Sequence, residues 1–143
     1  MTVQQLSIFV ENRSGRMAEI TEKIADAGID IRALSIADTT DFGILRLIVD
    51  KPEAAEQTLK DKGLTLSLTE VIAVQIDDKP GGFARAIRIL TDAGIDVEYM
   101  YAFVCRREGH ACVIIRVEDN GRAIEVLKNS GVEMLTQQEI FNM

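Results

Sequence analysis

Polar residues suited to ligand binding gather in two short segments, residues 11–16 and 77–82, each followed by a helical pattern. The first has the sequence Glu-Asn-Arg-Ser-Gly-Arg, and the second has the sequence Asp-Asp-Lys-Pro-Gly-Gly. Glycine lets the backbone come close to a ligand, and the free N–H groups of a helix start attract a carboxylate. Asp30 and Asp96, expected near the same end of a sheet as these segments, carry oxygens that can accept from an ammonium group. Together these groups could hold both ends of a free amino acid, with the amine on Asp30 or Asn12.

The same residues also have a purely structural explanation, and residue types alone do not decide between it and ligand binding. Gly15 and Gly81 suit tight turns, and Asp30 and Asp96 suit caps of the turn that precedes each of them. Both explanations predict the same elements around these positions, so the choice between them depends on what the folded chain brings together.

Catalytic chemistry has little support in this sequence. His110, the one histidine, lies near Cys105 and Cys112 on an expected hairpin, but no acid is placed to orient its ring. Gly81-Gly82 lacks the lysine and the serine or threonine of a phosphate-binding loop. A disulfide between the two cysteines stays open, although cytosolic chains usually keep thiols reduced. Three ligands on one tight hairpin cannot easily converge on a metal ion. We therefore expect no enzyme activity, no cofactor and no metal site.

The elements that must position the two segments come from an internal duplication. The pentapeptide Asp-Ala-Gly-Ile-Asp at 26–30 returns unchanged at 92–96, and the match continues on both sides of it. The second copy is longer by two residues, which fall in its turn at 106–110. A repeat at this spacing fixes the architecture before any finer analysis. The sequence predicts two domains in tandem, residues 1–69 and 70–143.

Hydrophobic periodicity predicts the same element order, β-α-β-β-α-β, in both copies. This order is typical of the α+β class, with two ferredoxin-like units that each pack two helices on one face of a four-stranded antiparallel sheet. Ser14 is expected to cap the first helix. The expected strands are 4–10, 29–37, 44–49, 64–68, 71–77, 96–106, 110–118 and 132–139, and the expected helices are 17–28, 50–63, 82–93 and 120–130.

Composition narrows the range of partners. A net charge of −7 without a basic cluster argues against nucleic-acid binding, which needs a lysine- or arginine-rich face. No apolar run approaches the length of a membrane span, and the N-terminus lacks a secretory pattern, so we expect a cytoplasmic protein with no membrane partner. Exposed sheet edges are usually paired, which favours a homodimer.

The loop at 11–15, the apolar Met17 and the segment 27–31 resemble the ACT domain, a small regulatory module that senses amino acids. The resemblance covers essentially the whole chain, and the predicted element order agrees with it. It implies that an amino acid binds at an interface between paired ACT domains, through the first strand-to-helix loop and the start of the second strand. The second copy of the signature lies at Asp78, Lys79, Pro80, Gly81, Phe83 and residues 93–97.

The resemblance assigns ligand-binding positions residue by residue in both copies. The second loop is more acidic than the first and therefore less favourable to a carboxylate, so the first loop is the preferred site. The first copy contributes Asn12, Arg13, Ser14, Gly15, Arg16, Met17, Asp30 and Ile31. The second copy contributes Asp78, Lys79, Pro80, Gly81, Gly82, Phe83, Asp96 and Val97.

Apolar residues close to these positions have spacings that helix-on-sheet packing requires, which favours core over pocket. If they line a pocket, their bulk suits a ligand with a medium or large side chain. They are Met17, Leu34 and Ile36 in the first copy and Phe83, Met100 and Tyr101 in the second.

The sequence therefore favours an amino-acid-binding regulatory protein that modulates a partner enzyme or regulator and is not itself an enzyme. Two alternatives stay open: a structural module that pairs through its ACT domains without a small ligand, and a regulatory subunit of an amino-acid biosynthetic enzyme. Binding to the native state raises the melting temperature, so a thermal-shift screen separates a sensor from a scaffold.

Overall fold

The computed structural model describes residues 1–38 and 41–143. The chain divides into two compact units, which we call the N-terminal unit (Gln4–Thr69) and the C-terminal unit (Glu70–Met143 with Met1–Val3). Each unit has the element order β-α-β-β-α-β, which confirms the predicted class of two ferredoxin-like units in tandem. Within the described residues, no helix combines the length and the apolar character needed to cross a bilayer.

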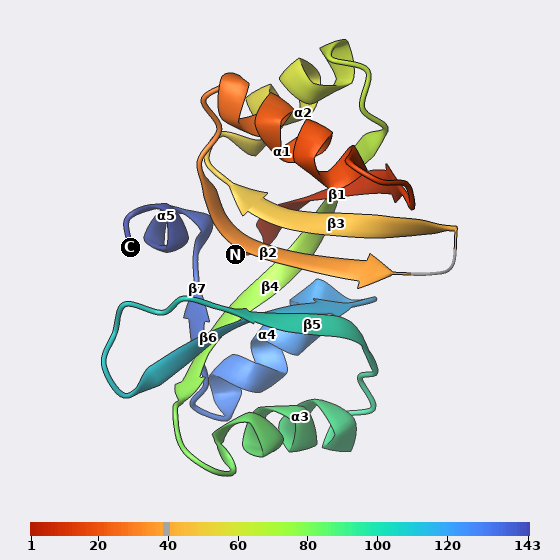
Figure 1. The fold of residues 1–143 in the computed structure, drawn as a ribbon. Coiled ribbons are helices and arrows are strands. Elements are labelled where there is room, and N and C mark those ends of the chain that lie inside the picture. The colour runs from red at the N-terminus through yellow and green to blue at the C-terminus, as the bar shows by residue number, and fades with distance from the viewer. Residues whose placement is uncertain (39–40) are drawn as a thin grey trace. The chain divides into compact units, whose positions relative to one another are not determined.

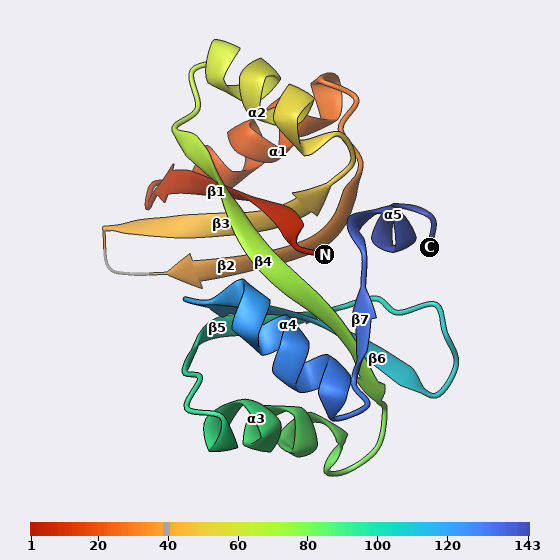
Figure 2. The ribbon, with the colours of Figure 1, turned by 180° about the vertical axis from the view of Figure 1, so that it is seen from behind.

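The N-terminal unit has a sheet with the strand order β2-β3-β1-β4. Alternation along β1 turns Leu6, Ile8 and Val10 to one face, where they are buried with Ile20 and Ile24 of the first helix. Helices α1 and α2 cover this face side by side (Figure 1, Figure 2). The elements are β1 (Val3–Glu11), α1 (Arg16–Asp26), β2 (Ile31–Asp38), β3 (Phe42–Val49), α2 (Pro52–Asp61) and the first residues of β4 (Leu66–Asp77).

The C-terminal unit repeats this plan with the strand order β7-β4-β6-β5, in which all neighbours are antiparallel. Its core contains Ile72 and Val74 of β4, Leu90 of α3, Ile115 of β6 and Leu127 of α4. The elements are the remainder of β4, α3 (Gly82–Asp92), β5 (Val97–Phe103), β6 (His110–Val117), α4 (Asn120–Asn129), β7 (Glu133–Leu135) and α5 (Gln137–Phe141).

The predicted strand at 132–139 is wrong in its second half, where the chain forms α5. Thr136 accepts a hydrogen bond from the Glu139 N–H (3.1 Å), and the Glu139 carboxylate accepts one from the Thr136 N–H (2.7 Å). This reciprocal pair is a capping box, and its Thr-x-x-Glu pattern was present in the sequence. The predicted strand at 96–106 is also too long, because β5 ends at Phe103.

The predicted cap of the first helix is wrong as well. Gly15, with a φ of 80°, is the residue that caps α1, and no side chain in the described part of the chain bonds to the helix start. Gly81 caps α3 in the same way, with a φ of 88°. Only a residue without a Cβ adopts this left-handed conformation readily, so both repeats need glycine here. Ser14 therefore does not satisfy the first N–H groups of α1.

Candidate functional site

The second predicted loop, residues 77–82, joins β4 to α3 and is held by two backbone hydrogen bonds. The Asp78 N–H donates to the Gly109 carbonyl and the Gly82 N–H donates to the Lys79 carbonyl, both at 3.0 Å. The first N–H groups of a helix have no partner within the helix, and among the described residues no side chain caps α3. The start of α3 therefore presents N–H groups that suit an anionic group of a ligand.

A cavity of about 370 Å³ lies beside this loop, which is large enough for a small-molecule site. Its polar wall is the loop itself, with Asp77, Asp78 and Lys79. Its other walls are mainly apolar, with the Tyr101 phenol as an exception, and come from β4, the first turn of α3, β5 and β6. The lining of these walls consists of Ile76, Phe83, Met100, Tyr101, Ala102, Ala111 and Val113. The cavity thus has a charged end and an apolar end.

Strand register shows which residues of the N-terminal unit correspond to this lining. The pair Val10–Gly43 in the N-terminal unit corresponds to the pair Ile76–Ala111 in the C-terminal unit. Likewise, the pair Ile36–Leu45 corresponds to the pair Ala102–Val113. The corresponding positions therefore carry Ile36 in one unit and Ala102 in the other. The γ1 and δ1 carbons of Ile36 lie 3.6 Å from where a Cβ on Gly43 would stand, so Ile36 lies over this part of β3.

The first predicted loop, residues 11–16, is occupied by its own ion pairs. Arg16 bonds to Glu11 (3.0 Å) and Glu19 (3.1 Å), and Arg13 bonds to Glu19 (3.0 Å). Hydrogen bonds from Arg13 and then Arg16 lower the pKa of the Glu19 carboxyl. Asn12 donates its backbone N–H to the Asp41 carbonyl at 3.0 Å. The arginine charges that would attract a ligand carboxylate are thus already paired with Glu11 of the loop and Glu19 of α1.

The expectation that Asp30 and Asp96 lie at the same end of the sheet as these loops is wrong. Gly43 pairs with both Val10 and Asp38, so the end of β1 lies level with the end of β2, whereas Asp30 precedes the start of β2. The physical reason is that a helix following a strand returns the chain to the opposite end of the sheet. Asp30 instead bonds to Arg32 at 3.1 Å.

Asp96 and Val97 are displaced from the second loop for the same reason. Asp77 pairs with His110, which begins β6, whereas Val97 pairs with Val117, which ends it. Asp96 lines a separate cavity of about 570 Å³ with Glu98, Glu118, Asp119 and Arg122. Within each unit, the structure therefore brings the loop residues together. The aspartate before the second strand lies apart from them, and so do Ile31 and Val97 at the start of that strand.

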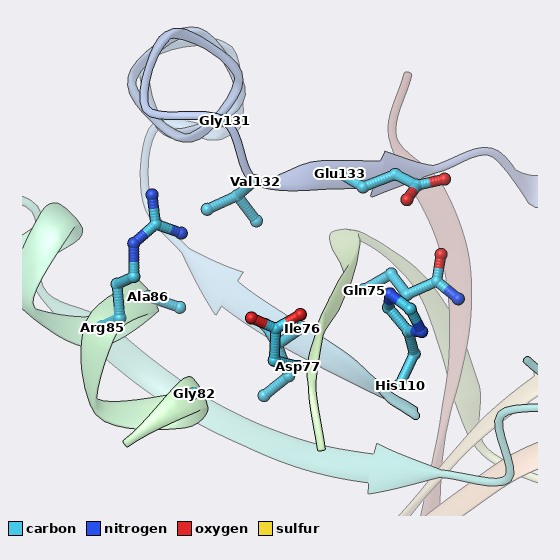
Figure 3. A pocket seen from close by; sticks show the side chains of 10 residues that line it. All are labelled: Gln75, Ile76, Asp77, Gly82, Arg85, Ala86, His110, Gly131, Val132 and Glu133. Carbon is cyan, nitrogen blue, oxygen red and sulfur yellow. The ribbon is translucent and has the colours of Figure 1, made fainter. Parts of the chain in front are cut away.

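Asp77 also lines a smaller cavity of about 150 Å³ (Figure 3). Figure 3 shows Arg85 on one side of it and His110 with Gln75 on the other, with Asp77 between them. The Arg85 guanidinium donates a hydrogen bond to the carbonyl of Ser130, the C-cap of α4, at 2.6 Å. This bond holds the positive charge of Arg85 at the C-terminal end of α4. Val132 and Glu133 complete the wall.

Gln75, missed by the sequence analysis, anchors a polar network at this wall. Its side chain is only 6 % exposed, accepts from Arg107 at 3.1 Å and donates to the Cys105 sulfur at 3.4 Å. Arg107 also bonds to Glu133 at 2.7 Å. A glutamine within the apolar run of β4 was the signal in the sequence, since buried polar groups require partners.

The two cysteines are free thiols that hydrogen-bond to each other, so the disulfide left open by the sequence is not formed. Partial burial raises the pKa of Cys105, but hydrogen bonds from Cys112, the Arg107 backbone and Gln75 outweigh it and lower the pKa overall. Burial, followed by the bond to Cys105, raises the pKa of Cys112 well above its usual range. The described residues contain no cluster of three or more histidine, cysteine or acidic side chains suited to a metal ion.

Two ferredoxin-like units in tandem, each with a glycine-capped helix after its first strand, define a duplicated small-domain protein. The profile of the ACT domain pair matches residues 1–143, and the chain belongs to this family. A comparison with proteins of curated function gave no match.

Solved structures agree with this assignment. Protein BT0572 from Bacteroides thetaiotaomicron is 39 % identical, with a TM-score of 0.92 over 100 % of this chain and 98 % of that chain. The regulatory subunits of aspartate kinase from Thermus thermophilus and Thermus flavus have TM-scores of 0.63 and 0.62 at 16 % and 17 % identity. These matches cover 89 % and 90 % of this chain and 91 % and 92 % of theirs, and at such identity they show a shared fold.

Proposed function

We propose that this ACT domain pair is a regulatory protein that binds a free amino acid at the β4–α3 loop of its C-terminal unit. The observation that carries the proposal is the cavity of about 370 Å³, which joins a charged loop to an apolar interior. Membership of the ACT domain pair family supports a ligand at a strand-to-helix loop. This choice departs from the preference for the first loop, because the arginines of that loop are paired with Glu11 and with Glu19 of α1.

The proposed binding mode divides the ligand between the two ends of the cavity. The ligand carboxylate meets the N–H groups at the start of α3, with Lys79 nearby to offset the acidic residues. The ammonium group meets Asp78, whose carboxylate lines the cavity, since Asp77 is paired with Lys79 at 3.8 Å. Asp78 replaces Asp30 and Asp96, which lie at the opposite end of their own sheets. The ligand side chain then extends between α3 and β5.

The regulatory output follows from the ligand's preference for one state of the protein. A ligand shifts an equilibrium only by its differential affinity for the two states. We propose that the target is an enzyme or regulator of amino-acid metabolism, in the cytoplasm, and that this chain is not itself an enzyme. The likeness to aspartate kinase regulatory subunits supports a catalytic polypeptide as the target.

We also propose that the chain forms a homodimer. Within their units, β2 and β5 are edge strands, and such edges favour pairing. Sedimentation velocity at micromolar concentration tests this proposal, and a monomer alone would overturn it.

A thermal-shift screen with the twenty amino acids tests the sensor function. We expect one or a few amino acids to raise the melting temperature, since a ligand at a hundred times its Kd stabilises the native state by about 2.7 kcal/mol. Asp78→Ala should abolish the shift, whereas the corresponding change in the first loop, Asn12→Ala, should retain it. A shift that survives Asp78→Ala but disappears in Asn12→Ala would place the site in the N-terminal unit.

A structural pairing module is the second candidate, favoured by apolar side chains on the edge strand β2. Leu34 is 62 % exposed and Ile36 is 48 % exposed, and such residues suit contact with another protein surface. This candidate predicts that none of the twenty amino acids changes the melting temperature at millimolar concentration.

A further inference from the structure

We propose that the amino acid bound by the C-terminal unit has a branched aliphatic or aromatic side chain, and that Ala102 makes room for it. This inference rests on the proposed function and specifies the class of ligand. It comes from a difference between two copies of one fold: Ala102 stands where the N-terminal unit has Ile36.

The apolar end of the cavity selects the ligand by its composition. Its walls away from the loop carry thioether, methyl and ring groups from Phe83, Met100, Ala111 and Val113. A carboxylate on the ligand side chain would lose its water there without gaining a cationic partner, which opposes binding, and a short side chain such as that of serine would bury little apolar area. Each buried methylene group, in contrast, strengthens binding about fourfold. A ligand that ends at the α-carbon, such as glycine, leaves this part of the cavity unused.

Ala102 sets the size of that apolar end. Its neighbour across the strand pair is Val113, and the next residue on the same face of β6 is Ala111, so small side chains lie together here. In the N-terminal unit the same face carries Ile36 over Gly43. The larger side chain on β2 fills the space beside the smaller residue on β3. Alanine at both positions of the C-terminal unit leaves that volume open.

Phe83 and Met17 show the same difference on the helix side. Met17 packs against the core of the N-terminal unit. Phe83, at the corresponding position, lines the cavity and is 43 % exposed. An aromatic ring at the entrance of an apolar cavity offers a flat contact surface to a branched or aromatic side chain. The residue on the helix and the residue on the strand therefore both favour a ligand side chain in this unit.

The duplicated chain provides its own control for the test. Ala102→Ile introduces the residue that the other unit already has at this position, and isoleucine suits an edge strand. Ile36→Ala is the reciprocal change in the N-terminal unit. Both variants are made in the full chain, and their melting temperatures without ligand are measured first. Ala102→Val is a milder replacement if Ala102→Ile does not fold.

Each protein is titrated with leucine, isoleucine, valine, phenylalanine, tyrosine, glycine, serine and aspartate, and the melting temperature is recorded. We expect the wild type to be stabilised by one or more of the first five and not by the last three. Ala102→Ile should weaken the best ligand at least about tenfold, since the added carbons would take up volume that the ligand side chain needs, while Ile36→Ala should leave it unchanged.

Two results separate failure of this inference from failure of the proposed function. Stabilisation only by glycine, serine or aspartate, or unchanged affinity in a folded Ala102→Ile, overturns the ligand class while the sensor function stands. Stabilisation by none of the twenty amino acids overturns both.

Discussion

The two units share one fold and differ where the first strand meets the first helix. In the N-terminal unit this place is filled by the Arg16 side chain, which is only 12 % exposed and pairs with Glu11 and Glu19. In the C-terminal unit the corresponding position is Gly82, which lines the cavity of about 150 Å³. The difference shows how a duplicated domain can keep its fold while the side chains at this loop diverge between the two copies.

Among the substitutions that test this comparison, we expect Gly82→Ala to change the free energy of unfolding most. A Cβ at this position would overlap the carbonyl oxygen of Asp77, a backbone atom that cannot move without shifting β4. We expect Gly82→Ala to destabilise the protein by about 1–3 kcal/mol, the usual cost of overpacking. Urea unfolding of both proteins measures the difference.

Gly121→Ala is the matched control for this substitution. A Cβ there would stand 3.7 Å from an Asp119 carboxylate oxygen, which is an ordinary contact. Because Gly121 lies in α4, alanine should be neutral or stabilise by up to about 1 kcal/mol. Equal effects of the two substitutions would contradict the close approach of α3 to Asp77.

Arg107 provides the next largest effect, because its partner Gln75 is nearly buried. The carboxylates that pair with Arg13 and Arg16 in the N-terminal unit are, in contrast, exposed. Arg107→Ala leaves the nearly buried Gln75 carbonyl oxygen without its hydrogen bond. An unsatisfied buried acceptor costs about 1–3 kcal/mol. Arg13→Ala removes only exposed ion pairs and should cost measurably less. A larger loss for Arg13→Ala in urea unfolding would contradict this ranking.

Glu19 should show the smallest effect, and one that depends on pH. Arg13 and then Arg16 hold its pKa below the usual value, so the folded state favours the ionised form. The stabilisation is therefore present above the unfolded-state pKa of about 4.3 and is lost as pH falls through the lower folded-state pKa. The difference in urea midpoint between wild type and Glu19→Gln should be small at pH 7 and should disappear in acid. A difference that grows in acid would contradict the sign.

The sequence predicted the repeat, the element order and the core, because those features depend on local periodicity. Leu6, Ile8 and Val10 alternate along β1 and are all buried, and Gly28 ends the first helix with a φ of 70°. The capping box at Thr136 was also local and was simply missed.

The candidate site was harder to predict, because it depends on residues that are distant in the sequence. The space beside Ala102 depends on its pairing with Val113 and on the neighbouring Ala111, and this register exists only in the folded sheet. The position of Asp30 could have been inferred from topology, since the intervening helix reverses the direction of the chain. The pairing of Arg16 with Glu11 and Glu19 depends on side-chain directions that periodicity does not specify.

Isothermal titration calorimetry of the full chain, with the amino acid that gives the largest thermal shift, tests the central claim most directly. That claim is that the C-terminal unit binds the ligand while the N-terminal unit does not. We predict a single site per chain, with affinity strongly reduced in Ala102→Ile and retained in Ile36→Ala. Two equivalent sites per chain, or binding that is lost in Asn12→Ala and unchanged in Ala102→Ile, would contradict it.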